Sequence, residues 1–206
     1  MTKIPSLTDV QSDALCEVAN IGAGHAATAL SQMTGTTVMI SVPRITVVSL
    51  IEIFPATLVD DESAAIVSMA LSGSMHGNTL LVLPIGTARR IASLVLHRDV
   101  GAHVEFDSME TSVLTEVGNI LTGAYVTALS EFLRMRLLPS PPTFVCGLAR
   151  PVLLNAIRYL ECANEWVICV ETQFMVAHVD DQLRGYFLLL PDDAAFDALL
   201  AAVRVD

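Results

Sequence analysis

The sequence predicts an α/β protein of the α+β class, in which two repeats share one sheet and one core. Three observations predict this. A long helical segment occurs twice at a constant offset of 99 residues, extended β-branched segments follow each copy, and no linker-like stretch separates the halves. Helices and sheets must bury their apolar faces, so the repeats are expected to pack together. We expect one domain over residues 1–206, with repeat 1 at about 6–100 and repeat 2 at about 105–206, ahead of two independent domains.

The duplication is clearest in the two helical segments. DALCEVANIGAGHAATALS (residues 13–31) aligns without a gap with SVLTEVGNILTGAYVTALS (residues 112–130), and 10 of the 19 positions are identical. Unrelated segments would match at about one position, because common residues each make up roughly a tenth of a chain. Duplication is therefore the economical explanation.

Each long helix has its own start signal. Thr8 with Gln11, and Asp107 with Glu110, have the spacing of a capping box, in which each side chain bonds the backbone N–H of the other residue. We expect the first helix to end near Gly35 and the second near Pro139.

Shorter elements follow each helix in a similar order. In the first half, we expect strands over residues 36–40, 64–71 and 79–83, a turn over 73–77, and a helix over 86–97. In the second half, we expect strands over residues 166–172 and 185–190, a closing helix over 192–203, and an additional helix over 148–160.

Composition excludes several classes of protein. With 53% apolar and 16% charged residues, the chain has the balance of a globular protein rather than a disordered one. The net charge of −11 opposes attraction to nucleic acid and favours a protein partner or a small ligand. The most apolar stretch, residues 38–59, is broken by Pro43, Arg44, Glu52 and Pro55, so we expect no membrane span. The N-terminus lacks a secretory signal, and we expect a cytoplasmic protein.

Cysteine and histidine spacing gives no metal site. The cysteines form no CxxC pair and have no histidine at zinc-site spacing, so buried free thiols are favoured over a disulfide or a metal. They are Cys16, Cys146, Cys162 and Cys169.

A polar stripe recurs on both long helices. Because each helical residue advances by about 100°, residues spaced as 13, 17, 20 and 24 fall on one face. The stripes are Asp13, Glu17, Asn20 and Gly24 in the first copy, and Ser112, Glu116, Asn119 and Gly123 in the second. The alternative is a solvated face whose glycine permits close helix packing. This alternative is weakened because the stripe recurs in both copies, whereas neighbouring positions such as Cys16 and Thr115 differ between them.

Apolar residues flank the first stripe. Their helical spacing predicts that they belong to the core. They include Leu15, Val18, Ile21 and Leu30. The offset also extends to Pro43 and Pro142, which we expect to shape the chain after each helix, because proline fixes φ and has no N–H.

These residues resemble a known family. The pattern Asp/Ser-x3-Glu-x2-Asn-x22-Pro occurs twice and is similar to that of the CheC phosphatases of chemotaxis, as are the words NIGAGHAATALS and GNILTGAY. The resemblance covers nearly the whole chain and implies two pseudosymmetric halves about a shared antiparallel sheet, with the long helices exposed. It also implies hydrolysis of the aspartyl phosphate of a CheY-like response regulator, with the receptor deamidase CheD as a second partner.

The implied chemistry divides the stripe into roles. A carboxamide has both donors and an acceptor while it stays neutral, so Asn20 and Asn119 are candidates to orient the attacking water. Glu17 and Glu116 are candidates to anchor the partner through a lysine near its phosphorylated aspartate. We expect no cofactor on this chain and Mg²⁺ on the response regulator. Asp13 and Ser112 have no assigned role beyond a rim contact or solvation.

Two other functions compete with this one. The first is a non-catalytic module, related to the flagellar switch proteins, that binds phosphorylated CheY or CheD without effective hydrolysis. The second is a CheX-type phosphatase that acts as a homodimer with one site per chain. Two intact motifs in one chain argue against the second.

Overall fold

Two 26-residue helices, α1 (Asp9–Thr34) and α4 (Ser108–Leu133), dominate the computed structural model. The structure describes residues 7–49, 53, 62–99, 101, 105–159, 166–177 and 183–202. Both predicted capping boxes are confirmed. Thr8 and Gln11 exchange side-chain and backbone hydrogen bonds at the start of α1, and Asp107 and Glu110 do so at the start of α4.

The two long helices end differently. Gly35 ends α1 in the left-handed conformation at φ 65°, as predicted. The predicted end of the second helix near Pro139 is wrong, because α4 stops at Leu133. Arg134 takes a left-handed φ of 52°, and its N–H donates to the carbonyls of Glu131 and Ser130. The chain then becomes extended as strand β4 (Leu137–Pro139), which pairs with strand β2 (Ser63–Gly73).

The remaining elements largely follow the predicted order. Repeat 1 continues with β1 (Val38–Ser49), β2 (Ser63–Gly73), β3 (Gly77–Pro84) and α3 (Ile85–Leu96). Repeat 2 continues with β4 (Leu137–Pro139), β5 (Thr143–Leu148), α5 (Ala149–Tyr159), β6 (Trp166–Val176), β7 (Leu183–Pro191) and α6 (Asp193–Ala202). Strands β4 and β5 were not predicted. Three prolines in residues 139–142 obscure the strand pattern there.

The strands that the structure describes all belong to one antiparallel sheet, so the predicted α+β class is confirmed. The order is β1-β6-β7-β3-β2-β4, and β5 also pairs with β2. The equivalent strands of the two repeats are β1 and β4/β5, β2 and β6, and β3 and β7. Exchanging each strand with its equivalent gives the same order, now starting from the opposite edge of the sheet. The first strand of each repeat pairs with the hairpin of the other repeat: β1 pairs with β6, and β4 and β5 pair with β2. The two halves are therefore interleaved about the central β3–β7 pair, where Leu80 lies opposite Leu188.

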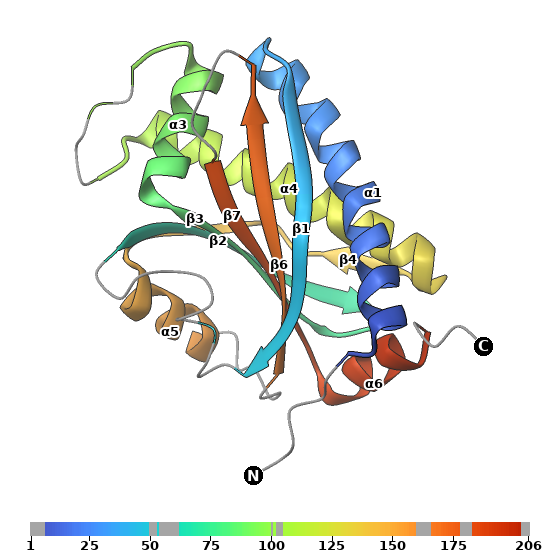
Figure 1. Cartoon of the computed structure of the whole chain (residues 1–206). Helices are drawn as coiled ribbons and strands as arrows, with labels where there is room; N and C mark the ends of the chain where they lie inside the picture. Colours follow the sequence, from blue (N-terminus) through green and yellow to red (C-terminus); the bar gives the residue numbers. More distant parts are fainter. Residues whose placement is uncertain are drawn as a thin grey trace.

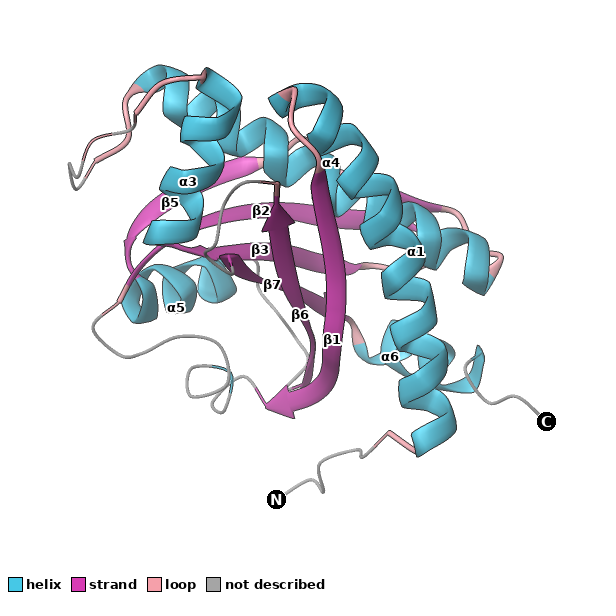
Figure 2. Cartoon of the chain, turned by 45° about the horizontal axis from the view of Figure 1, so that its top comes forward, coloured by secondary structure: helices cyan, strands magenta, loops and turns pink. Residues whose placement is uncertain are grey.

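The helices cover the two faces of the sheet unequally. Helices α1 and α4 lie side by side over one face, and α5 lies on the other (Figures 1 and 2). Strand residues alternate accordingly: Ala65 and Val67 of β2 pack beneath the long helices, whereas Ala64 and Ile66 pack toward α5. This alternation is the two-residue period of a sheet buried on both faces. No helix within the described residues is long and apolar enough to cross a membrane.

Candidate functional site

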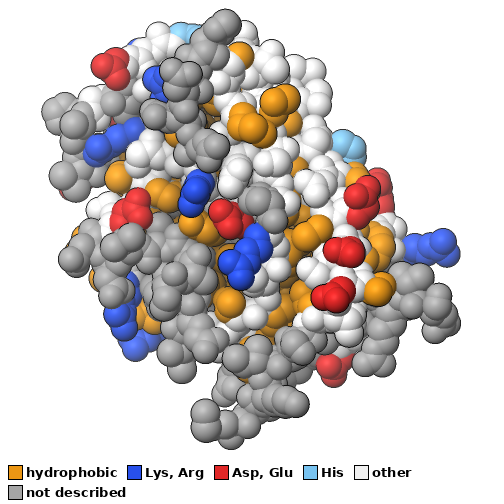
Figure 3. Space-filling model, in the orientation of Figure 1, with side chains coloured by type: hydrophobic (Ala, Val, Ile, Leu, Met, Phe, Trp, Pro, Cys, Tyr) orange, Lys and Arg blue, Asp and Glu red, His pale blue; other side chains and the backbone are white. Residues whose placement is uncertain are grey.

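Both polar stripes lie outside the core, on the outer faces of the long helices. On α1, all four members of the stripe are exposed; on α4, Ser112 and Glu116 are exposed, whereas Asn119 and Gly123 are half-buried. Figure 3 shows acidic side chains spaced along α1, at the right of the view. The opposite faces of the helices hold the buried residues, which include Leu15 and Val18 on α1 and Leu114 and Val117 on α4.

One flanking residue differs from its prediction. Ile21 was expected in the core, but its side chain is 45% exposed. It follows Asn20 on the helix and is directed about 100° away from it, which places it outside the buried stripe that Leu15, Val18 and Leu30 occupy. Apolar residues extend around much of α1, so the sequence does not show where its buried face ends. Ile21 therefore lies on the exposed surface of α1.

The stripe glycines have a different function from close helix packing. A Cβ atom added to Gly24 or Gly123 would meet no heavy atom within 4 Å. Helix packing instead depends on Gly22, where an added Cβ would lie 2.9 Å from Cδ1 of Tyr125 and 3.1 Å from the carbonyl oxygen of Ala124. Gly24 and Gly123 therefore leave open space beside each asparagine, at a cost in helix propensity of roughly 1 kcal/mol each.

The Asn20 amide is held by two backbone groups. Nδ2 donates to the carbonyl of Cys16 at 2.9 Å, and Oδ1 accepts from the N–H of Val42 in β1 at 3.2 Å. These partners fix the orientation of the amide, because a carbonyl needs a donor and an N–H needs an acceptor. Among the described residues, no hydrogen bond reaches the side chain of Asn119.

The two motif prolines lie where the strand ladders are irregular. In β1, the pairing with β6 shifts by one residue between Ser41 and Arg44, around Pro43. In repeat 2, Pro139 pairs with Leu71, whereas Thr143 pairs with Ser68, so one extra residue lies in the segment that contains Pro142. Proline is tolerated at such bulges because no ladder N–H is needed there. The same bulge thus follows each site helix at the same offset.

The carboxylates of the stripes are available to a partner. The ion pairs among the described residues join Arg98 to Asp107 and Glu110, at the start of α4, and none involves Glu17 or Glu116. The backbone N–H of Glu110, and after it the Arg98 guanidinium, lower the pKa of Asp107. This pair supports the capping box and lies apart from the Glu/Asn face.

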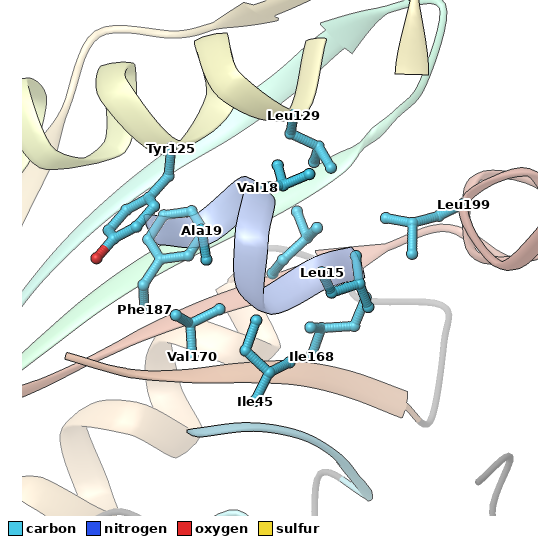
Figure 4. A pocket seen from close by; sticks show the side chains of 11 residues that line it. Leu15, Val18, Ala19, Ile45, Tyr125, Leu129, Ile168, Val170, Phe187 and Leu199 are labelled. Carbon is cyan, nitrogen blue, oxygen red and sulfur yellow. The ribbon is translucent and has the colours of Figure 1, made fainter. Parts of the chain in front are cut away.

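The interior beneath α1 offers no competing reaction site. A cavity of about 40 Å³ lies between α1, α4 and the sheet, and Figure 4 shows it lined by apolar side chains such as Leu15, Ile45 and Phe187. The hydroxyl of Tyr125 hydrogen bonds to Thr172 at 3.1 Å, and burial raises its pKa to about 12. Such a phenol stays neutral and serves packing.

The described cysteines are free thiols, but the predicted burial holds only for Cys169, because Cys16 and Cys146 are half-buried. Cys16, Cys146 and Cys169 are free, and burial raises the pKa of the Cys169 thiol to about 12. Cys162 lies outside the described residues. Within the described part of the chain, no three His, Cys, Asp or Glu side chains are grouped so that they could hold a metal ion.

This geometry defines the class of protein: a pseudosymmetric α+β protein whose candidate site is a Glu/Asn face present on two exposed helices. Such a face suits a macromolecular partner better than a small substrate, which needs a concave pocket. The chain is similar to the CheC-like family in its two site segments. The family model matches residues 10–47 and 109–146, and each matched segment runs from the site helix through the bulge.

Individual proteins are similar to this chain over most of its length. The chain is 29% identical over 205 residues to the CheY-P phosphatase CheC of Bacillus subtilis, with 98% of each chain covered. The crystal structure of Thermotoga maritima FliY matches with a TM-score of 0.77 at 22% identity, over 96% of this chain and 97% of that one. A chain in the CheX–CheY–BeF3–Mg²⁺ complex of Borrelia burgdorferi matches with a TM-score of 0.54 at 20% identity, over 86% of this chain and 97% of that one.

Proposed function

We propose that this protein is a phosphatase that hydrolyses the aspartyl phosphate of a CheY-like response regulator in chemotaxis. The observation that carries the proposal is the repeated Glu/Asn pair on two exposed helix faces, contained in both segments that match the CheC-like family. The full-length similarity to a CheY-P phosphatase, and a fold relative in complex with CheY, support it. Such a partner also implies a cytoplasmic site of action.

In this mechanism, water attacks the phosphorus atom in line with the bond to the aspartyl oxygen. That bond breaks, and the products are inorganic phosphate and the free aspartate carboxylate. Asn20 or Asn119 orients the water, because one amide can accept a proton of the water through Oδ1 and donate through Nδ2. In the structure, one N–H and one lone pair of the Asn20 amide are occupied by its bonds to Cys16 and Val42.

Charge determines what the partner must bring. The described residues of this chain offer Glu17 and Glu116 at the sites and no grouped metal ligands. We propose that Mg²⁺ is held by the response regulator, where it offsets the charge of the phosphoryl oxygens. Glu17 and Glu116 then pair with a cation of the partner, for which a lysine beside the phosphorylated aspartate is suited. CheD is a proposed second partner.

The function is tested by measuring loss of phosphate from a phosphorylated CheY-like protein with Mg²⁺, with and without this chain. We expect the rate of loss to increase with the concentration of this protein. Binding of the phosphorylated regulator without any acceleration would instead favour the non-catalytic binding module.

A double substitution tests the anchor role of the glutamates. We expect Glu17→Gln with Glu116→Gln to raise KM for the phosphorylated regulator about tenfold or more, because each docked complex loses a charge-assisted contact. The chemical step should change less, so the effect on kcat should be smaller. The measurement is steady-state phosphate release over a range of regulator concentrations.

The matched control for this test is Glu62→Gln with Glu131→Gln, which changes the net charge equally away from the stripes. A KM as high in the control as in the site variant would attribute the effect to general electrostatics. An unaltered KM in the site variant would rule out the anchor role.

A further inference from the structure

The two sites differ in the hydrogen bonds that their asparagine side chains make. In site 1, the amide of Asn20 accepts the N–H of Val42 at 3.2 Å and donates to Cys16 at 2.9 Å. Its side chain is therefore held against the surface of its own protein, between α1 and β1. In site 2, no described residue hydrogen bonds to the side chain of half-buried Asn119, which leaves its amide to water or to a partner.

The sequence gives the physical reason why site 2 lacks the hydrogen bond from the bulge. The bulge of repeat 1 has the sequence Ser41-Val42-Pro43, and that of repeat 2 has Ser140-Pro141-Pro142. Pro141 stands at the position of Val42, 99 residues later, in a segment that also contains one extra residue relative to its partner strand. Proline has no N–H, so position 141 cannot donate the bond that Val42 donates. The difference between the two sites is therefore fixed by the covalent structure of the bulge residue.

We propose that the bulge residue, Val42 in site 1 and Pro141 in site 2, is a positioning residue that sets the turnover of each site, with site 2 the faster. This rests on the proposed phosphatase function. To place water on a docked phosphate, Asn20 must turn from Val42 toward the partner. The site is competent only while the amide is released, and a fractionally populated competent state lowers the observed rate by that fraction.

Single-site variants give the first test. Asn119→Ala leaves only site 1 active, and Asn20→Ala leaves only site 2. We expect kcat to be roughly fivefold lower in Asn119→Ala than in Asn20→Ala, since the net contribution of one neutral hydrogen bond corresponds to about that factor in an equilibrium constant. KM should be similar, because each variant retains both glutamates. Equal kcat values, or a slower Asn20→Ala variant, would overturn the proposal.

Exchange of the bulge residues tests the cause. With only site 2 active, Pro141→Val supplies an N–H and recreates the Ser-Val-Pro sequence of repeat 1; kcat should fall severalfold. Pro141 is exposed, so the fold should tolerate the change. With only site 1 active, Val42→Pro should raise kcat. Val42 is buried, so this substitution can also destabilise the fold. Pro141→Val is therefore the deciding variant. A kcat that Pro141→Val leaves unchanged contradicts the proposal.

Pro139→Val is the matched control in the same background. Pro139 is exposed, and it lies two residues before Pro141, in the paired part of β4. This variant removes a proline and adds an N–H without placing it at the position equivalent to Val42. Its kcat should remain that of site 2. A loss as large as that in Pro141→Val would indicate a structural effect of proline removal.

A readout independent of phosphatase activity separates this inference from the proposed function. Hydrogen exchange of the Val42 amide, followed by NMR, should be slow in the native protein and faster in Asn20→Ala. Unchanged exchange would show that the tether, the hydrogen bond from the Val42 N–H to the Asn20 side chain, does not form in solution. If the native protein shows no phosphatase activity, the proposed function fails while the tether can still be observed. If the protein is active with two equal sites, only this inference fails.

Discussion

Replacement of Asn20 and Asn119 together by alanine is expected to reduce phosphate release at least about 100-fold while the phosphorylated regulator still binds. The reason is geometric: without an amide to orient it, water samples many directions, and misplacement of a reacting group by about 1 Å can cost a factor of this size. Both glutamates stay in place, so docking is retained. Phosphate release and equilibrium binding, measured on the same preparation, separate the two effects.

The chain offers a matched control in Asn155→Ala. Asn155 is an exposed asparagine on α5, the helix on the other face of the sheet from α1 and α4. Its replacement should leave hydrolysis and binding as they are in the native protein. Hydrolysis that persists in the Asn20→Ala and Asn119→Ala double variant would end the water-positioning role. Loss of binding in that variant would assign the asparagines to docking instead.

Gly118→Ala is expected to destabilise the fold by about 2 kcal/mol, a fall in Tm of roughly 4–8 °C for a chain of this size. A Cβ atom at this position of α4 would lie 2.6 Å from the side-chain carbons of Val67. Val67 is 1% exposed in β2 and has a stiff branched side chain, so it cannot move aside without disturbing the sheet. The loss therefore exceeds the gain in helix propensity. Thermal unfolding measures it.

Gly123→Ala is the control on the same helix. It makes the same chemical change five residues later, where a Cβ meets no atom within 4 Å, and it should raise stability by up to about 1 kcal/mol through helix propensity. A Tm for Gly118→Ala at or above that of Gly123→Ala would show that α4 can shift away from the sheet at Val67.

The local features of this protein could be predicted from the sequence. Thr8 with Gln11, and Asp107 with Glu110, form the predicted capping boxes, because a capping box uses only residues within one helical turn. The turn between β2 and β3 was predicted for the same reason, from two glycines four residues apart. The exposure of Glu17 and Glu116 also agrees with the helical stripe.

Features that depend on distant neighbours were not predicted. Whether Ile21 is buried depends on where the sheet and α4 pack against α1, and the apolar sequence around it gives no such information. Strands β4 and β5 exist because β2 supplies pairing partners that are distant in the sequence: Gly73 pairs with Leu137, 64 residues later, and Ser68 pairs with Thr143, 75 residues later. The early end of α4 follows, since Leu137 must leave the helix to pair there.

The sequence by itself determined that one Glu/Asn stripe occurs on two helices, since helical spacing is a local property and the 99-residue repeat is explicit in the residues. Only the tertiary structure decided how the repeats interleave and that the two sites differ. The hydrogen bond from Val42 to Asn20 joins residues 22 positions apart on a strand and a helix. Asn119 has no such bond because Pro141, which stands at the position equivalent to Val42, has no N–H to donate. The sequence shows this proline, but only the fold shows that its position corresponds to a hydrogen-bond donor of the other site.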